Sequence, residues 1–140
     1  DGTLMVTVDT NTGSARSGDI TVAGQTIQIT QAALSCSYNV SPTSQSVTAQ
    51  GGSFIVNVDA SSSSCPWTAF ESLTWASLSS TGGTGDGTLM VTVDTNTGSA
   101  RSGDITVAGH VIQVSQAEVQ EIITPIFPLL LSGQFSPKIR

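Results

Sequence analysis

The segment DGTLMVTVDTNTGSARSGDITVAG occupies residues 1–24 and returns without a change at residues 86–109. The copies begin at positions 1 and 86, which gives a period of 85 residues, the size of a small domain and too long for a solenoid repeat. Similarity continues past the identical block, because QTIQITQAA at 25–33 parallels HVIQVSQAE at 110–118. The repeat therefore predicts three parts: a partial unit at residues 1–33, a complete unit at 34–117 and a tail at 118–140.

The complete unit shows the alternation of half-buried β-strands. SFIVNVDA (53–60), TLMVTVDT (88–95) and DITVAGHVIQVSQ (104–116) place apolar side chains at every second position, and Ala108-Gly109 is the expected turn of a hairpin. The side chains expected to face the core are those of Phe54, Val56, Val58, Leu89, Val91, Val93, Ile105, Val107, Ile112 and Val114. Weaker strands are expected at 38–41, 45–49 and 74–79, a turn-rich loop at 96–103, and a flexible connection at GGTGDG (82–87). About seven short strands at this spacing predict an all-β chain built as an Ig-like β-sandwich, with one complete and one partial tandem repeat.

Composition excludes several classes of function. The formal net charge is -6, and the four basic residues are scattered or terminal, so no surface can gather the positive field that nucleic acid requires. The most apolar run, IITPIFPLLL at 122–131, is too short to span a bilayer and is broken by prolines, so we expect no transmembrane segment.

The two cysteines, Cys36 and Cys65, both lie in the complete unit. We expect a disulfide rather than two free thiols, because a Ser- and Thr-rich β-protein with few lysines is typical of an oxidising compartment. The expected location is therefore extracellular, at the cell surface or periplasmic. Two cysteines accompanied only by His110 make a poor zinc site, and we expect neither a metal nor a cofactor.

An ordered set of motifs runs through the complete unit: CSYNVSP, GGSFIVNV, CPWTA, WASLSSTGGTGDGTLMVTVDTN and ARSGDITVAGHVIQVSQA. This pattern resembles the BACON family of Ig-like domains over residues 36–117, and over 1–32 as a half-domain. The resemblance implies a non-catalytic module of bacterial extracellular and cell-surface proteins. For such modules it implies either carbohydrate binding, in the company of glycoside hydrolases, or a spacer role.

The aromatic residues have two candidate roles, sugar contact and core packing. Trp67, Trp75 and Tyr38 are candidate carbohydrate contacts, since an exposed ring offers a flat apolar face to a sugar, and Phe70 is a similar case. Each of them is also a candidate for the hydrophobic core, because the chain has few large side chains. Trp67 in addition lies close to Cys65, as in the packing of a tryptophan against the disulfide of Ig-like sandwiches.

No group of residues predicts catalysis. The carboxylates are scattered, and His110 stands where the other copy has Gln25, which gives no support for a catalytic base. Arg101 and its counterpart Arg16 are expected to make structural hydrogen bonds or ion pairs across the adjacent loop, near Asp104 and Asp19.

The tail departs from the repeat and carries many large apolar residues in an extended, proline-broken segment. We expect it to dock on another subunit or on the open half-domain through Ile122, Ile123, Ile126, Phe127, Leu129, Leu130, Leu131 and Phe135. Three explanations of the partial unit stay open: the end of a longer array, cleavage, or completion by another chain.

The sequence therefore places a structural or adhesive role first, with other protein chains as partners. The alternative is a carbohydrate-binding module of a polysaccharide-degrading system, with a glycan as its partner. An enzyme is a distant third.

Overall fold

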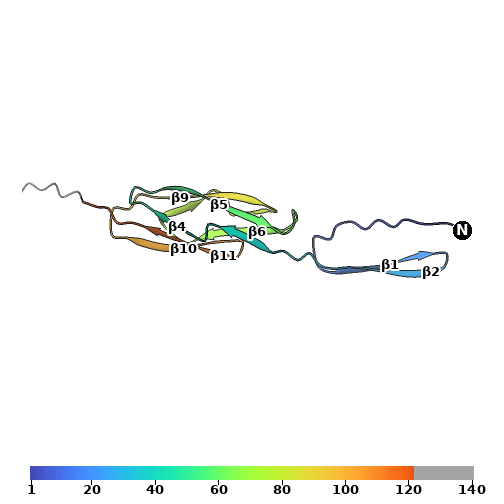
Figure 1. Cartoon of the computed structure of the whole chain (residues 1–140). Coiled ribbons are helices and arrows are strands. Elements are labelled where there is room, and N and C mark those ends of the chain that lie inside the picture. Colours follow the sequence, from blue (N-terminus) through green and yellow to red (C-terminus); the bar gives the residue numbers. More distant parts are fainter. Residues whose placement is uncertain (122–140) are drawn as a thin grey trace, which may run out of the picture.

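The computed structural model describes residues 1–121 and contains eleven strands (Figure 1). These residues contain no helix, and therefore no helix that could cross a membrane. The strands are β1 (Arg16–Val22), β2 (Gln25–Gln31), β3 (Tyr38–Ser41), β4 (Ser44–Val47), β5 (Gly52–Ala60), β6 (Pro66–Glu71), β7 (Ala76–Leu78), β8 (Gly82–Thr84), β9 (Gly87–Val93), β10 (Arg101–Val107) and β11 (His110–Gln116). The apolar tail residues from Ile122 to Phe135 lie outside the described part, and their docking stays a prediction.

Strands β3 to β11 form a sandwich of two sheets. One sheet has the order β4-β11-β10-β6-β8 and the other the order β3-β5-β9-β7. All pairings are antiparallel except that of β4 with β11, which is parallel. The all-β, Ig-like sandwich predicted from the sequence is confirmed.

The core lies between the sheets and follows the alternation of the sequence. Each long strand turns every second side chain inward, as the period of a pleated strand requires. Nine of the expected core residues are buried, and Phe54 is half-buried against them. The nine are Val56, Val58, Leu89, Val91, Val93, Ile105, Val107, Ile112 and Val114.

The expectation of a flexible connection at residues 82–87 is wrong at its start. Residues 82–84 form strand β8, which pairs with β6, and β9 begins at Gly87. Glycine is needed here because the ring of Trp67 lies against the strand: a Cβ at Gly83 would lie 2.6 Å from Cζ2 of Trp67. The close approach of a ring, rather than flexibility, explains these glycines. The expected loop at 96–103 is also shorter, since β10 begins at Arg101.

The partial unit forms a separate two-stranded hairpin, β1 with β2, which extends beyond one end of the sandwich (Figure 1). Its turn, Ala23-Gly24, has φ of 49° and 77°, and the equivalent turn Ala108-Gly109 has 49° and 79°. Positive φ at both central residues is typical of the type I′ turn that suits a two-residue hairpin. The hairpin predicted around Ala108-Gly109 is confirmed.

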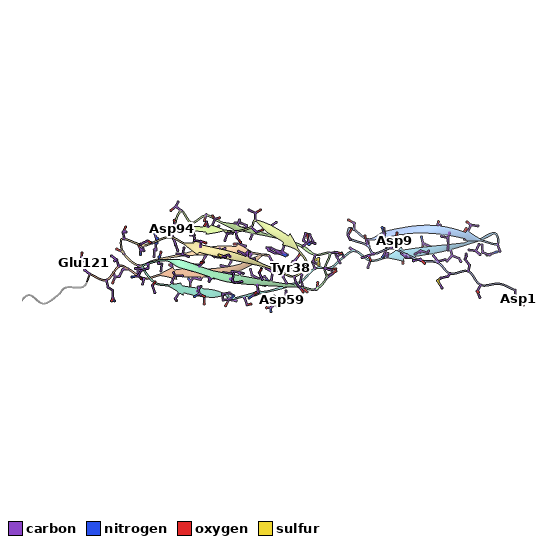
Figure 2. The ribbon with its side chains drawn as sticks, turned by 90° about the horizontal axis from the view of Figure 1, so that it is seen from above. Asp1, Asp9, Tyr38, Asp59, Asp94 and Glu121 are labelled. Atoms are coloured by element: carbon purple, nitrogen blue, oxygen red, sulfur yellow. A yellow bond between two sulfur atoms is a disulfide. The ribbon has the colours of Figure 1, made fainter. Side chains whose placement is uncertain are left out.

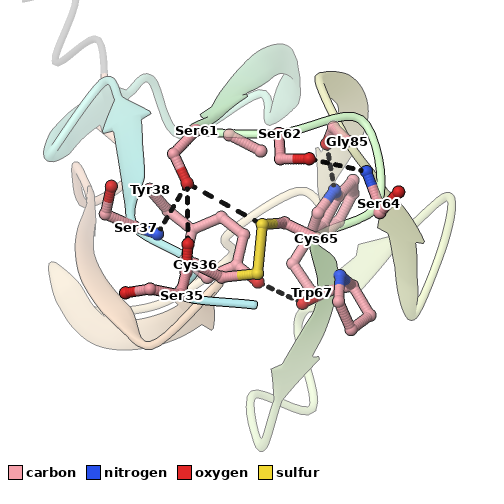
Figure 3. Close-up of a disulfide and its surroundings, with 12 residues drawn as sticks. Ser35, Cys36, Ser37, Tyr38, Ser61, Ser62, Ser64, Cys65, Trp67 and Gly85 are labelled. Carbon is pink, nitrogen blue, oxygen red and sulfur yellow. Dashed lines mark hydrogen bonds between the residues drawn. A yellow bond between two sulfur atoms is a disulfide. The ribbon is translucent and has the colours of Figure 1, made fainter. Parts of the chain in front are cut away.

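A disulfide joins Cys36 to Cys65 (Figure 3). It lies at the end of the sandwich next to the partial unit, since Cys36 lines one pocket with Gly13 and Ser14. The cysteines are 29 residues apart in sequence, with a Cα–Cα distance of 5.5 Å. In the chain-entropy model, closing a loop of this length stabilises the fold by about 3–4 kcal/mol. The expected disulfide is thus present.

Candidate functional site

Trp67 belongs to the core. It points inward from β6 and is 6% exposed. Its indole N–H donates to the carbonyl oxygen of Gly85 at 2.9 Å, close to the disulfide (Figure 3). A ring enclosed in this way has no free face for a sugar, so of the two roles weighed for Trp67 the structure favours packing.

Trp75 is half-buried beneath Arg101, whose guanidinium carbon lies 4.6 Å from the ring centroid. Arg101 Nε donates to the side-chain oxygen of Gln116 at 2.9 Å, and its Nη2 donates to the carbonyl oxygens of Asp94 and Thr95. The expected structural hydrogen bonds of this arginine are present, although its partners are Gln116 and two carbonyls. The arginine covers one face of Trp75 and fixes the loop between β9 and β10.

Tyr38 is half-buried at the end of the sandwich opposite to that of Asp94 (Figure 2). Its hydroxyl donates to the carbonyl oxygen of Pro66, beside the disulfide (Figure 3). Trp75 lies near Asp94, whose backbone N–H donates to the carbonyl of Trp75. The three aromatic candidates are therefore dispersed between the core and the two ends, and the structure does not bring them together on one exposed surface.

Phe70 is the aromatic side chain that the structure exposes, at 62%, and among residues 1–121 no other aromatic residue is exposed to this degree. It points outward from β6, because Trp67 and Ala69 on the same strand point inward. On the outer face of the five-stranded sheet, Phe70 is aligned with Thr106 of β10, and Thr106 with the exposed Val111 of β11.

The next row of the same face is polar. Asp104 is aligned with Gln113, and Gln113 with Ser44. Successive outward side chains on one strand are about 7 Å apart and neighbouring strands about 5 Å apart, so the rows lie side by side. We call this surface the Phe70 face, and define it by Phe70, Thr106, Val111, Asp104, Gln113 and Ser44.

The Phe70 face combines an apolar ring with hydroxyl, amide and carboxylate groups that can donate and accept hydrogen bonds. Its one carboxylate is that of Asp104, so it offers no acid pair for hydrolysis. In the part of the chain that the structure describes, no three His, Cys, Asp or Glu side chains gather to hold a metal ion. The chemistry available is adsorption of a polar ligand that has an apolar side.

The sequence of β6 contains a signal for this face in its alternation. In PWTAFE, burial of Trp67 and Ala69 fixes Thr68 and Phe70 on the opposite side of the strand.

A second exposed surface lies on the partial unit. Ile27 is 48% exposed, whereas its counterpart Ile112 is fully buried, and Leu4 is 67% exposed against 2% for Leu89. Val6 and Val8 are likewise exposed, although Val91 and Val93 are buried. We call the apolar side of residues 1–32 the open face, and define it by Leu4, Val6, Val8, Ile20, Ile27 and Ile29.

A comparison with family models finds one that matches residues 1–32 and 66–117, more than half of the chain: BACON, described as "Putative binding domain, N-terminal". The chain belongs to the BACON family. A search of the curated proteins finds no match. The BACON assignment agrees with the Ig-like sandwich and with the pairing of Cys36 with Cys65, which fits a secreted or surface protein.

A solved structure with a similar fold is the Bacteroides ovatus GH5 xyloglucanase in complex with a XXXG heptasaccharide. The similarity has a TM-score of 0.53 at 24% sequence identity and covers 60% of this chain. It covers 19% of the xyloglucanase chain, so the shared part is a small portion of that enzyme. At this level of identity the comparison supports the fold.

Proposed function

We propose that the chain is a non-catalytic, extracytoplasmic accessory module that binds carbohydrate on the Phe70 face. The observation that carries this proposal is the exposure of Phe70 on a sheet surface otherwise rich in hydroxyl and amide groups. A phenyl ring offers a rigid apolar surface to the C–H side of a pyranose, and the polar row beside it can bond the sugar hydroxyls.

Two comparisons support a carbohydrate ligand over the structural role that the sequence placed first. The family is described as a binding domain, and the similar xyloglucanase was solved with a XXXG heptasaccharide. Xyloglucan oligosaccharides are therefore the first ligands to test.

Phe70→Ala is expected to lower the affinity of the full chain for the XXXG heptasaccharide by about tenfold or more, because it removes the one aromatic ring of the Phe70 face on which a sugar can stack. Isothermal titration calorimetry measures the change. Ile55→Ala is the matched control: Ile55 is also exposed, but lies on the outer face of the four-stranded sheet. Full affinity in Phe70→Ala, or equal losses in both variants, contradicts the site.

An assembly role is the second candidate function, and the open face favours it. Exposed apolar side chains gathered on one surface are typical of contacts with another polypeptide. The expected docking of the tail belongs to this candidate. A repeat module that joins protein chains and a module that binds glycan use different parts of the molecule, so both functions are compatible in one chain.

A further inference from the structure

The open face is ordered as it would be inside a complete domain. Asn11 Nδ2 donates to the carbonyl oxygens of Ser14 and Ala32, both at 2.7 Å. Asn96 makes the equivalent bonds in the complete unit, at 2.8 and 2.9 Å. The β1–β2 register, with Ile20 opposite Ile27, is also that of β10 and β11. Residues 1–32 therefore hold a preformed conformation.

The side-chain hydrogen bonds of Arg101 and Gln116, which we call the arginine clamp, are repeated in the partial unit by Arg16 and Gln31. Arg16 Nε donates to Gln31 Oε1 at 2.8 Å, and Gln31 Nε2 donates to the carbonyl oxygen of Asp9 at 2.9 Å. The extended segment before the hairpin stays beside it, since Val6 and Val8 line one cavity with Ile20 and Ile29. The polar contacts that need only residues 1–32 are thus already made.

Within the described part of the chain, residues 86–117 make further contacts that residues 1–32 lack, and their partners in these contacts belong to residues 34–85. Gln116 Nε2 also donates to the carbonyl oxygens of Thr48 and Ala49, and Arg101 lies over Trp75. A Cβ at Gly103 would collide with the side chain of Leu73. Among residues 1–121, the counterparts Gln31 and Arg16 have no such partners, and a Cβ at Gly18 would meet nothing within 4 Å.

The chain's own residues 34–85 cannot cover the open face in place of residues 86–117. If residues 1–32 replaced residues 86–117 in the sandwich, Ala32 would lie where Ala117 lies, next to Val47. Cys36 would remain bonded to Cys65 at the opposite end of the sandwich. The nine residues of β5 separate these two ends of the sandwich, about 26 Å at the rise of a strand. Four residue steps from 32 to 36 reach at most about 14 Å.

A second copy of the chain offers no better cover. Its residues 34–85 are already covered by its own residues 86–117, which follow directly in the same chain. Exchange between copies would replace the existing contacts by closely similar ones, because residues 1–24 and 86–109 are identical, and it would add the entropic cost of association.

We propose that residues 1–32 bind a half-domain of the same type as residues 34–85 that lacks its own last three strands, and thereby complete a second sandwich. Such a half-domain supplies the carbonyl oxygens for Gln31, an indole for Arg16 and a leucine for Gly18. It also pairs with residues 2–8 on both sides, as β5 and β7 pair with β9.

The test is a titration of the full chain into a dye-labelled polypeptide of residues 34–85 with the Cys36–Cys65 disulfide closed, followed by fluorescence anisotropy. We expect a saturable complex of one to one. Ile27→Asp in the full chain should weaken it by at least about tenfold, because a carboxylate would enter the new core. Thr26→Asp is the matched control, since adjacent residues of a strand point to opposite faces.

Each other result contradicts the proposal. Failure to bind while the labelled polypeptide stays soluble overturns it, as do equal losses in Ile27→Asp and Thr26→Asp. Binding that appears only after removal of residues 122–140 identifies the tail as the occupant instead. Concentration-dependent dimers of the chain alone, sensitive to Ile27→Asp, identify a second copy. Since Ile27 and Phe70 lie in different units, failure here leaves the carbohydrate proposal to its own test.

Discussion

Ile112→Ala is expected to lower the free energy of unfolding of the sandwich by about 2–5 kcal/mol, whereas Ile27→Ala changes it by less than about 1 kcal/mol. The two isoleucines occupy equivalent positions of the repeat and pair with equivalent partners, Ile105 and Ile20. Ile112 is fully buried between the sheets, so its removal leaves a cavity, while Ile27 faces outward from the hairpin at 48% exposure.

Urea denaturation followed by tryptophan fluorescence measures both variants, because Trp67 and Trp75 lie in the sandwich and report its unfolding alone. Each variant is the control for the other, since the deleted atoms are the same. A large loss in Ile27→Ala would mean that the open face is covered in solution and coupled to the sandwich.

Trp67→Ala is expected to cost about 3–5 kcal/mol, the largest effect of a single substitution in the complete unit. The ring is buried in the core, its N–H is bonded to the carbonyl oxygen of Gly85, and Gly83 and Gly87 lie against its edge. Because Gly83 and Gly87 have no side chains, they cannot fill the space that the ring leaves on their side.

Thermal or urea unfolding followed by far-UV circular dichroism avoids dependence on the deleted fluorophore. Trp67→Phe should give an intermediate loss, since it keeps part of the packing but not the hydrogen bond. Phe70→Ala is the control on the same strand and is expected to cost less than about 1 kcal/mol, because its ring is exposed. Comparable losses at positions 67 and 70 would contradict the inward and outward assignments of β6.

Much of the fold could be predicted because its signals are local. A strand alternates its side chains with period two whatever it pairs with, so Val56 and Val58, or Ile105 and Val107, were assigned to the core from their spacing alone. The turn at Ala108-Gly109 and the closeness of Cys36 and Cys65 were likewise predicted. Strands β6 and β8 were missed, since CPWTAF and GGT carry weak periodicity and pair only through their neighbours.

The candidate site depended on sheet order, which no local pattern contains. Phe70, Thr106 and Val111 form one row because β6, β10 and β11 are adjacent, although 41 positions of sequence separate residue 70 from residue 111. Trp67, on the same strand as Phe70, lies in the core. Sequence reasoning identified the residue types but could not assign them to surfaces.

The two copies of the repeat distinguish the contribution of the sequence from that of the tertiary structure. By itself the sequence determined the local conformation: residues 1–24 and 86–109 are identical, and both copies form the same hairpin with the same turn and the same side-chain clamps. Only the tertiary structure decided in which copy the apolar side chains are buried and in which they are exposed. Burial requires an opposing sheet, and residues 34–85 provide one to the second copy alone, so identical side chains are buried there and exposed in the first.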